Sequence, residues 1–265
     1  VISSRREQPS MIRTEPMQQH GTELDRALAL WREWGLPLTG RPKVLQEVHG
    51  GRTNRNFRLT APGMGEDLLL RINHPDPFRL GIDRTLEREI VDLTAAAGIS
   101  RPCLYWDPAN RYVVFPWLEA RPWTAADLAC RDQRARLWPL IERLRSIRTQ
   151  HARRSYHAYL QHYWDQLKNV ATIDNSLEQR WRDFKPRLEA FDAAPWHARL
   201  VHHDLVPANI LDTGQRLYLI DWEYAAPGHP DIDTWYLEPE RIEELFIAEL
   251  MEWINTLWED LVRTK

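Results

Sequence analysis

A short polar segment in the C-terminal part of the chain brings together several residue types that can carry out chemistry. It reads "HHDLVPAN" and follows the pattern H-x-D-x(4)-N through His202, Asp204 and Asn209. It stands between two strand-like runs, "RLV" and "ILD", and a second carboxylate, Asp221, ends the apolar run "LID" twelve positions after Asn209. Such groups are costly to bury unless they are paired or bind a ligand. We therefore expect them to form a site.

The chemistry expected of this site is the transfer of a phosphoryl group. One carboxylate must accept the proton of the acceptor hydroxyl, and oxygen ligands must hold Mg²⁺ against the phosphates. Asp204 is the candidate base, and Asn209 and Asp221 are the candidate Mg²⁺ ligands, because amide and carboxylate oxygens are hard donors. His202 is expected to brace the loop. The alternative is that these residues only form turns, but their joint spacing is far more restrictive than a turn preference.

The elements that position these residues are predicted from the period of the apolar residues. A first helix is expected from Thr22, where "TELD" offers a capping box, to Gly35. Three strand-like runs, "KVLQEVH", "NFRLTA" and "DLLLRIN", are broken by turns and predict a small antiparallel sheet. A helix over "DRTLEREIVDLTAAAG" and two further strands, "CLYW" and "RYVVFPWL", follow.

After Trp123 the apolar spacing becomes helical. Three helices are expected, over "DQRARLWPLIERLRSIRTQ", "SYHAYLQHYWDQL" and "SLEQRWRDFKPRLEAF", and a last one starts near Pro239. The predicted organisation is α+β, with a flexible tail over residues 1–21, a small β-rich lobe over 22–118, and a larger helical lobe over 119–265 that contains the polar segment.

Composition excludes several classes of protein. The chain has 265 residues and a net charge of -3, which argues against a dedicated nucleic-acid binder. Two cysteines are too few for a disulfide scaffold, which makes the cytoplasm the expected location. No apolar run approaches the length of a membrane span, and the N-terminal residues lack the apolar core of a secretory signal. The oligomeric state stays open.

The polar segment also carries a family resemblance. Its signature, H-x-D-x-x-x-x-N followed by "IDWE", resembles that of the aminoglycoside phosphotransferase and choline kinase superfamily, and "IDWEYA" is especially similar to the choline, ethanolamine and thiamine kinase branches. The resemblance implies a protein-kinase-like fold of two lobes, with ATP and Mg²⁺ as cofactors. It implies the same roles for Asp204, Asn209 and Asp221. "GHPDID" is similar to the family's G-D-P-x-x-D, with Asp233 as the closing aspartate and His229 in place of the first.

The resemblance extends to a glycine-rich hairpin upstream. "HGGRTNRNFRL" looks like the G-G-x-T-N-x-N-[YF] of choline kinases. Gly50 and Gly51 would let the backbone turn tightly over the phosphates. Thr53 and Asn54 could donate to phosphate oxygens. An ordinary glycine hairpin would be the simpler explanation if this motif stood alone.

A cation and an acid complete the expected nucleotide site. Arg71 stands where protein kinases use lysine, and a guanidinium suits phosphate geometry and stays charged. Glu87 is the best match for the acid that pairs with this cation, and Glu89 is the second choice. Backbone groups from Phe115 to Leu118 are expected to meet the adenine, as the resemblance implies.

The acceptor is less constrained by the sequence. The resemblance favours an alcohol on a small cationic amine, such as choline or ethanolamine, and aromatic faces attract such cations. The candidate acceptor residues are Trp222, Glu223, Tyr224, Asp233 and Trp235, with Tyr236, Trp253 and Trp258 as further aromatic candidates. For each tryptophan, and for Trp253 above all, packing in the core is the stronger alternative.

Other functions stay open at this point. A thiamine kinase and an aminoglycoside or sugar phosphotransferase fit the same motifs. A metal-dependent hydrolase is the more distant alternative, with the ligands His202, His203, Asp204, Asp221 and His229. That alternative leaves the glycine-rich hairpin, Arg71 and Asn209 unexplained.

Overall fold

The computed structural model of the chain describes residues 17–242 and 244–264, with side chains from residue 23 onward. Two compact units are present. The sheet unit comprises Val1–Asn73 and Leu104–Val114, and the helical unit comprises His74–Cys103 and Phe115–Lys265.

Helix α2, Arg84–Ala96, belongs to the helical unit, whereas the predicted lobe of residues 22–118 grouped it with the sheet. A buried ion pair between Arg84, at the start of this helix, and Glu223 joins it to the helical unit. The sequence could not reveal this pair, because its two residues stand far apart in the chain. The side chain of Asp83 caps α2 by accepting from the backbone N–H groups of Thr85 and Leu86.

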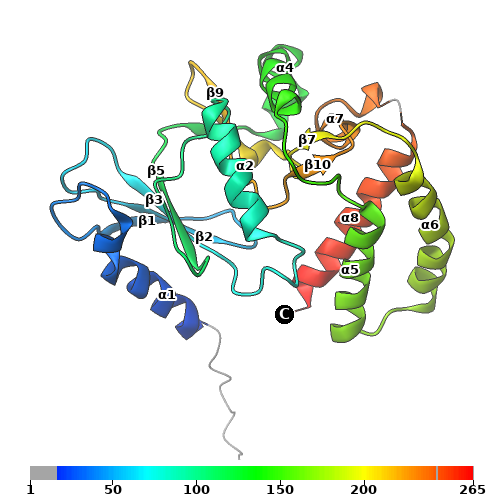
Figure 1. Cartoon of the computed structure of the whole chain (residues 1–265), viewed down its shortest axis with the longest axis horizontal. Helices are drawn as coiled ribbons and strands as arrows, with labels where there is room; N and C mark the ends of the chain where they lie inside the picture. Colours follow the sequence, from blue (N-terminus) through cyan, green and yellow to red (C-terminus); the bar gives the residue numbers. More distant parts are fainter. Residues whose placement is uncertain (1–16, 243, 265) are drawn as a thin grey trace, which may run out of the picture. The chain divides into compact units, whose positions relative to one another are not determined.

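The sheet unit is built on a five-stranded sheet (Figure 1). Its strands are β1 (Val44–Val48), β2 (Arg55–Leu59), β3 (Leu68–Ile72), β4 (Tyr105–Trp106) and β5 (Tyr112–Pro116). They lie in the order β1-β2-β3-β5-β4. Because β1 pairs antiparallel with β2 and β2 with β3, the three consecutive antiparallel strands predicted from the sequence are confirmed.

A helix near the N-terminus packs on this sheet. Helix α1 is Met17–Ala29, and a 3-10 turn, η1 (Trp31–Trp34), ends at Gly35 with a positive φ of 67°. Ala27 and Leu28 share a buried cluster with the apolar side chains of the sheet. The helix begins at Met17, five residues before the predicted start at Thr22. The predicted tail, 1–21, therefore overlaps α1, and its first sixteen residues lie outside those described.

The helical unit holds most of the remaining elements. Its other helices are α3 (Ala125–Ala129), α4 (Arg131–Ser146), α5 (Tyr156–Val170), α6 (Asn175–Ala193), α7 (Asp231–Leu237) and α8 (Phe246–Arg263). The last helix begins at Phe246, so the predicted start near Pro239 is wrong; a 3-10 turn, η3 (Pro239–Arg241), stands there. The apolar period of the helix begins only at Phe246, after a charged stretch. Within the part of the chain that the structure describes, no helix is both long and apolar enough to cross a membrane.

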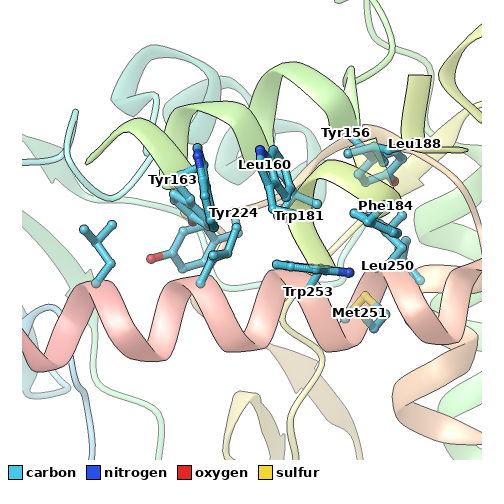
Figure 2. Close-up of a cluster of buried hydrophobic side chains, with 14 of the residues drawn as sticks. Tyr156, Leu160, Tyr163, Trp181, Phe184, Leu188, Tyr224, Leu250, Met251 and Trp253 are labelled. Carbon is cyan, nitrogen blue, oxygen red and sulfur yellow. The ribbon is translucent and has the colours of Figure 1, made fainter. Parts of the chain in front are cut away.

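Helices α5, α6 and α8 enclose the larger core (Figures 1 and 2). Trp253 of α8 is buried and stacks on Phe184 of α6 at 5.1 Å between ring centroids. It also meets the edge of Trp181 at 5.4 Å. The predicted place of Trp253 in the core is confirmed.

Short strands place the polar segment. They are β6 (Arg121–Pro122), β7 (Arg199–Val201), β8 (Ile210–Asp212), β9 (Leu217–Leu219) and β10 (Ala226–Gly228), and a 3-10 turn, η2 (Pro207–Asn209), precedes β8. β7 pairs with β10, and β8 lies between β6 and β9. His202 therefore follows the end of β7, Asn209 precedes β8, and Asp221 follows β9. The hairpin between β8 and β9 brings Asn209 and Ile220 together, with the N–H of Ile220 donating to the carbonyl of Asn209 at 3.1 Å.

Removing the Trp253 side chain should destabilise the protein strongly. We expect Trp253→Ala to lower the free energy of unfolding by about 3–5 kcal/mol, because the indole fills space between three helices. Leu245→Ala is the matched control, since Leu245 precedes the same helix and is 85% exposed. Chemical denaturation followed by circular dichroism measures both. A loss below about 1 kcal/mol for Trp253→Ala would contradict its place in the core.

Candidate active site

Asp204 and Asn209 form a hydrogen-bonded pair on the loop after β7. The amide Nδ2 of Asn209 donates to the main-chain carbonyl of Asp204 at 2.8 Å and to its carboxylate oxygen Oδ2 at 3.0 Å. The short turn η2 makes this return possible, because it brings Asn209 back beside Asp204. With Nδ2 used in this way, the carbonyl oxygen of the amide is the atom that can coordinate a cation.

Asp233 holds the backbone of this loop by hydrogen bonds. Its carboxylate is fully buried and accepts from the backbone N–H groups of His202, at 3.0 Å, and His203, at 3.2 Å. These bonds fix a loop in which His203 has a positive φ of 66°, a conformation that non-glycine residues rarely adopt. Asp233 was expected among the acceptor residues. The structure gives it no exposed surface for that role, and both its oxygens bind the loop backbone.

His202 connects the loop to the segment of Asp221. Its Nε2 lies 2.9 Å from the carbonyl of Ile220, and its Nδ1 lies 3.3 Å from the backbone N–H of Asp204. Burial lowers the pKa of His202, so a neutral ring that donates from Nε2 and accepts at Nδ1 satisfies both contacts. This geometry matches the brace predicted for His202. Any part of His202 in the chemistry stays a prediction.

A buried layer lies under the loop. The Nε2 of His203 is 3.1 Å from the hydroxyl of Tyr156, which also accepts from the backbone N–H of His229 at 2.9 Å. Burial lowers the pKa of His203 well below its usual value. A Cβ added at Gly228 would lie 2.5 Å from the Tyr156 hydroxyl and 2.7 Å from the His203 ring. Only glycine therefore fits at that position.

Burial governs the charge state of Asp204. It is the main cause that raises the pKa of this carboxyl to about 6; the negative charge of Glu223 adds to the effect, and the bond from Asn209 opposes it. Burial raises the pKa of Tyr159 and of Tyr236, and the charge of Asp204 contributes to both. Tyr236 also contacts the loop directly, since its hydroxyl donates to the main-chain carbonyl of His203 at 3.2 Å. Tyr159 was missed from the sequence, because α5 shows only the spacing of a packed helix.

Most of the aromatic acceptor candidates turn out to be packed. Trp222 is buried with its ring 4.7 Å from that of His202, and the buried Tyr224 accepts from the indole N–H of Trp258 at 2.8 Å. Trp235 and Tyr236 are half-buried and meet edge to face at 5.1 Å. Among these candidates, Trp235 and Tyr236 are thus rings whose faces an acceptor could use.

Two residues of the helical unit bind acids that the sequence had singled out. Arg84 donates to Glu87 at 2.6 Å and to Glu223 at 3.1 Å, with all three side chains buried. Glu89 is exposed and contacts His151 at 2.7 Å. The pairing predicted between Arg71 and Glu87 stays a prediction.

Arg145 holds a neighbouring helix, and nothing in the sequence indicated this role. Its guanidinium donates to the carbonyl of Pro230 at 2.7 Å and to the hydroxyl of Thr234 at 2.9 Å. Both residues lie at the start of α7, the helix that carries Asp233. Arg145 therefore holds in place the helix on which the loop depends.

The glycine-rich hairpin lies in the sheet unit, between β1 and β2. Gly50 has a φ of 122°, and a Cβ on Gly51 would lie 2.9 Å from the carbonyl oxygen of Asn54. Asn54 is buried and Thr53 is half-buried. This tight turn needs both glycines, as the sequence indicated.

The other expected nucleotide residues are placed as follows. Arg71, on β3, is buried, and its Nε donates to the side-chain carbonyl of Asn73 at 3.0 Å. Phe115 and Leu118 are half-buried at and beyond the end of β5. Their contacts with phosphate and adenine stay predictions.

The geometry does not support the metal-dependent hydrolase. Among the described residues, no group of three or more His, Cys, Asp and Glu side chains could hold a metal ion. The ring nitrogens of His202 and His203 are used within the fold, toward Ile220, Asp204, Tyr156 and the carbonyl of Val201. The donor set that remains, an amide oxygen and carboxylates, suits Mg²⁺.

Comparison with known proteins places this geometry in a wider context. Residues 44–260 match the model of a family described as the phosphotransferase enzyme family. Protein LicA homolog of Mycoplasma capricolum subsp. capricolum is 39% identical over 41 residues, which make up 16% of this chain and 17% of that protein. The match thus spans about one sixth of the curated relative.

Solved structures resemble the chain over much greater lengths. A choline/ethanolamine kinase family protein from Mesorhizobium loti is 24% identical, with a TM-score of 0.61 over 91% of this chain and 84% of its own. Choline kinase LicA from Streptococcus pneumoniae is 18% identical, with a TM-score of 0.67 over 92% of this chain and 91% of its own. Aminoglycoside phosphotransferase APH(4)-Ia, in a ternary complex with AMP-PNP and hygromycin B, is 16% identical, with a TM-score of 0.56 over 89% of this chain and 98% of its own. The predicted α+β fold of protein-kinase-like type is confirmed.

A side chain at position 228 should disturb the layer under the loop. We expect Gly228→Ala to lower the free energy of unfolding by about 1–3 kcal/mol, because its Cβ would overlap the Tyr156 hydroxyl and His203. The cost should be smaller in a Tyr156→Phe background, which lacks the nearer atom. Gly65→Ala is the control, since a Cβ there meets nothing within 4 Å. Equal losses in both backgrounds, measured by denaturation, would contradict the overlap.

Asp204 should titrate well above the usual range of an aspartate in the metal-free protein. The difference in proton uptake between the wild type and Asp204→Asn should be centred near pH 6, because burial raises the pKa to about 6. Asn209→Ala should move the midpoint to higher pH, since it removes a bond that stabilises the carboxylate, and Glu223→Gln should move it lower. A midpoint near pH 4, unchanged by both substitutions, would show that the carboxyl is solvated.

Proposed function

Because the chain belongs to the phosphotransferase enzyme family, as its motifs predicted, we propose that it transfers the γ-phosphoryl group of ATP to the hydroxyl of a small molecule. The observation that carries this proposal is the arrangement of one loop. Asp204 is held by Asn209, the loop backbone is held by Asp233, and His202 ties the loop to the residue before Asp221. The candidate proton acceptor and the candidate ligand Asn209 are thereby held by hydrogen bonds, and the residue before the second candidate ligand, Asp221, is tied to the same loop.

Each side chain has one task in the proposed reaction. Asp204 accepts the proton of the acceptor hydroxyl, and the oxygen of that hydroxyl forms a bond to the γ-phosphorus of ATP. The bond between the γ-phosphorus and the β,γ-bridging oxygen breaks at the same time, and ADP leaves. The pKa near 6 makes Asp204 a stronger base than an ordinary aspartate. Asn209, through its carbonyl oxygen, and Asp221 would hold Mg²⁺. The ion, when bound, neutralises negative charge on the phosphates.

Binding of ATP is supported by likeness rather than by contacts in this chain. APH(4)-Ia, of similar fold, is described with AMP-PNP. In the sheet unit the hairpin at Gly50 and Gly51 and the buried cation Arg71 are groups suited to phosphates. We therefore propose Mg²⁺·ATP as the phosphoryl donor.

For the acceptor we propose a small cationic amino alcohol of the choline or ethanolamine type. Asp204 carries a negative charge above its pKa of about 6, and negative charge in the proposed site favours a cation. The half-buried rings of Tyr159, Trp235 and Tyr236 supply aromatic faces. Similar folds belong to choline and ethanolamine kinases.

A sugar hydroxyl is the second candidate acceptor, and a specific contact favours it. The guanidinium of Arg154 lies 4.4 Å from the ring centre of Tyr159 and covers one of its faces. A second cation at that face would be repelled by Arg154. A neutral polyol would not be repelled, and the similar fold of APH(4)-Ia is described with hygromycin B.

The release of ADP from Mg²⁺·ATP tests the proposal. A panel of choline, ethanolamine, thiamine, an aminoglycoside and N-acetyl sugars should contain at least one acceptor. We expect Asp204→Asn to lower kcat by roughly 10²–10⁴-fold, because it removes the base, and Asp221→Asn to raise the Mg²⁺ concentration that gives half-maximal rate. Asp132→Asn, an exposed carboxylate on α4, is the matched control.

The outcomes of this assay separate its parts. Turnover of a cationic alcohol alone supports the first acceptor class, and turnover of sugars alone supports the second. Full turnover in purified Asp204→Asn would show that Asp204 is not the base. Silence across the panel together with no binding of Mg²⁺·ATP would exclude the proposed reaction.

A further inference from the structure

We propose that Arg84 is a positioning residue for the loop after β9, which contains the proposed magnesium ligand Asp221. Through Arg84, the order of this loop also depends on Glu87. The proposal rests on the proposed function only in calling Asp221 a metal ligand. The contacts that carry it lie wholly within the helical unit. They assign Glu87 a task in addition to the pairing with Arg71 that the sequence suggested.

The contacts centre on a single atom. Nη1 of Arg84 donates to Oε2 of Glu87 at 2.6 Å and to Oε2 of Glu223 at 3.1 Å. The side chains of Arg84, Glu87 and Glu223 are 4%, 0% and 2% exposed. Arg84 and Glu87 share the first turn of α2, whereas Glu223 stands 139 positions later in the chain. One cation thus joins a helix start to the loop after β9.

The loop needs such a restraint. Asp221 has a φ of 65°, which is unfavourable for an aspartate and persists only where the surroundings impose it. Its successors are held one by one: Trp222 packs on His202, Glu223 binds Arg84, and Tyr224 binds Trp258. Of these three contacts, the ion pair between Glu223 and Arg84 is the one between charged groups.

The ionic character of this contact bears on its role. A buried ion pair is seldom more stable than apolar packing of the same volume, whereas its geometry is specific. Because Glu87 and Glu223 share one Nη1 atom, a change at Glu87 alters the position and charge available to Glu223. Glu87 can therefore affect the loop without contacting it.

The plain alternative is that Arg84 only neutralises two buried acids. Under that alternative, substitutions at Arg84 lower the global free energy of unfolding. The molecules that stay folded then keep an ordered loop and normal kinetics. Under our proposal, the loop after β9 becomes less ordered while the rest of the protein stays folded. This loss of order appears even when Glu87 alone is changed.

Hydrogen exchange in the ligand-free protein separates the two. We expect Arg84→Met to speed exchange in the peptide spanning residues 217–228 by roughly tenfold or more, with α6 unchanged, and Glu87→Gln to do so in the same peptide to a smaller extent. Arg84→Lys, which keeps the charge, should restore most of the protection. Arg88→Met is the matched control, since Arg88 is exposed on the same helix.

Metal binding and kinetics supply the functional readout. Arg84→Met should weaken the binding of Mn²⁺ with ADP, measured by calorimetry, and lower kcat, each by roughly 10–100-fold, while the KM of the acceptor stays within about twofold. The effects of Glu87→Gln and Glu223→Gln on loop exchange should be non-additive with Arg84 present and additive in Arg84→Met.

Specific results would overturn the proposal. Loop exchange that is unchanged in Arg84→Met and in Glu87→Gln, despite a lower Tm, would reduce Arg84 to a neutralising ion pair. If Arg84→Met does not fold, the pair of Arg84→Lys and Glu87→Gln decides by the same exchange measurement. If the wild type transfers no phosphoryl group, the proposed function fails, yet loop exchange still tests Arg84.

Discussion

The site depends on one buried carboxylate that holds the backbone of the loop above it. Asp233 accepts from the N–H groups of His202 and His203, and no exposed surface is left on its side chain. These two bonds stabilise a backbone with a positive φ at His203. Asp204 follows directly, so its position depends on this anchor. Arg145 in turn holds the start of the helix that carries Asp233. The position of this loop is thus set by hydrogen bonds to its backbone.

Burial divides the polar groups of the site into two kinds. His202 and His203 are buried with lowered pKa values, and as neutral rings they serve as hydrogen-bonding supports. Asp204 has its pKa raised to about 6 by the same desolvation, which makes it a better proton acceptor. The environment therefore assigns neighbouring residues different roles. The supporting histidines and the proposed base Asp204 are thus neighbours in one short segment.

The acceptor side shows where local sequence signals mislead. Tyr224 was a candidate aromatic wall, but it binds Trp258 instead. Trp222 packs on His202, in line with the packing that the sequence favoured for each tryptophan. Tyr159, which no motif indicated, is half-buried with Arg154 over its ring. Periodicity indicates which side of a helix is apolar, whereas it does not indicate which buried ring borders a site.

The sequence by itself determined the family, the fold class and the sheet strands, and it predicted Asp204, Asn209 and Asp221 as site residues, because all of these follow from short motifs and local periods. Only the tertiary structure decided that Asp233 anchors the loop, that Gly228 must lack a side chain, and that Arg84 joins Glu87 to Glu223. These are contacts between residues far apart in the chain. No local pattern encodes them, since their partners meet only when the strands and helices pack.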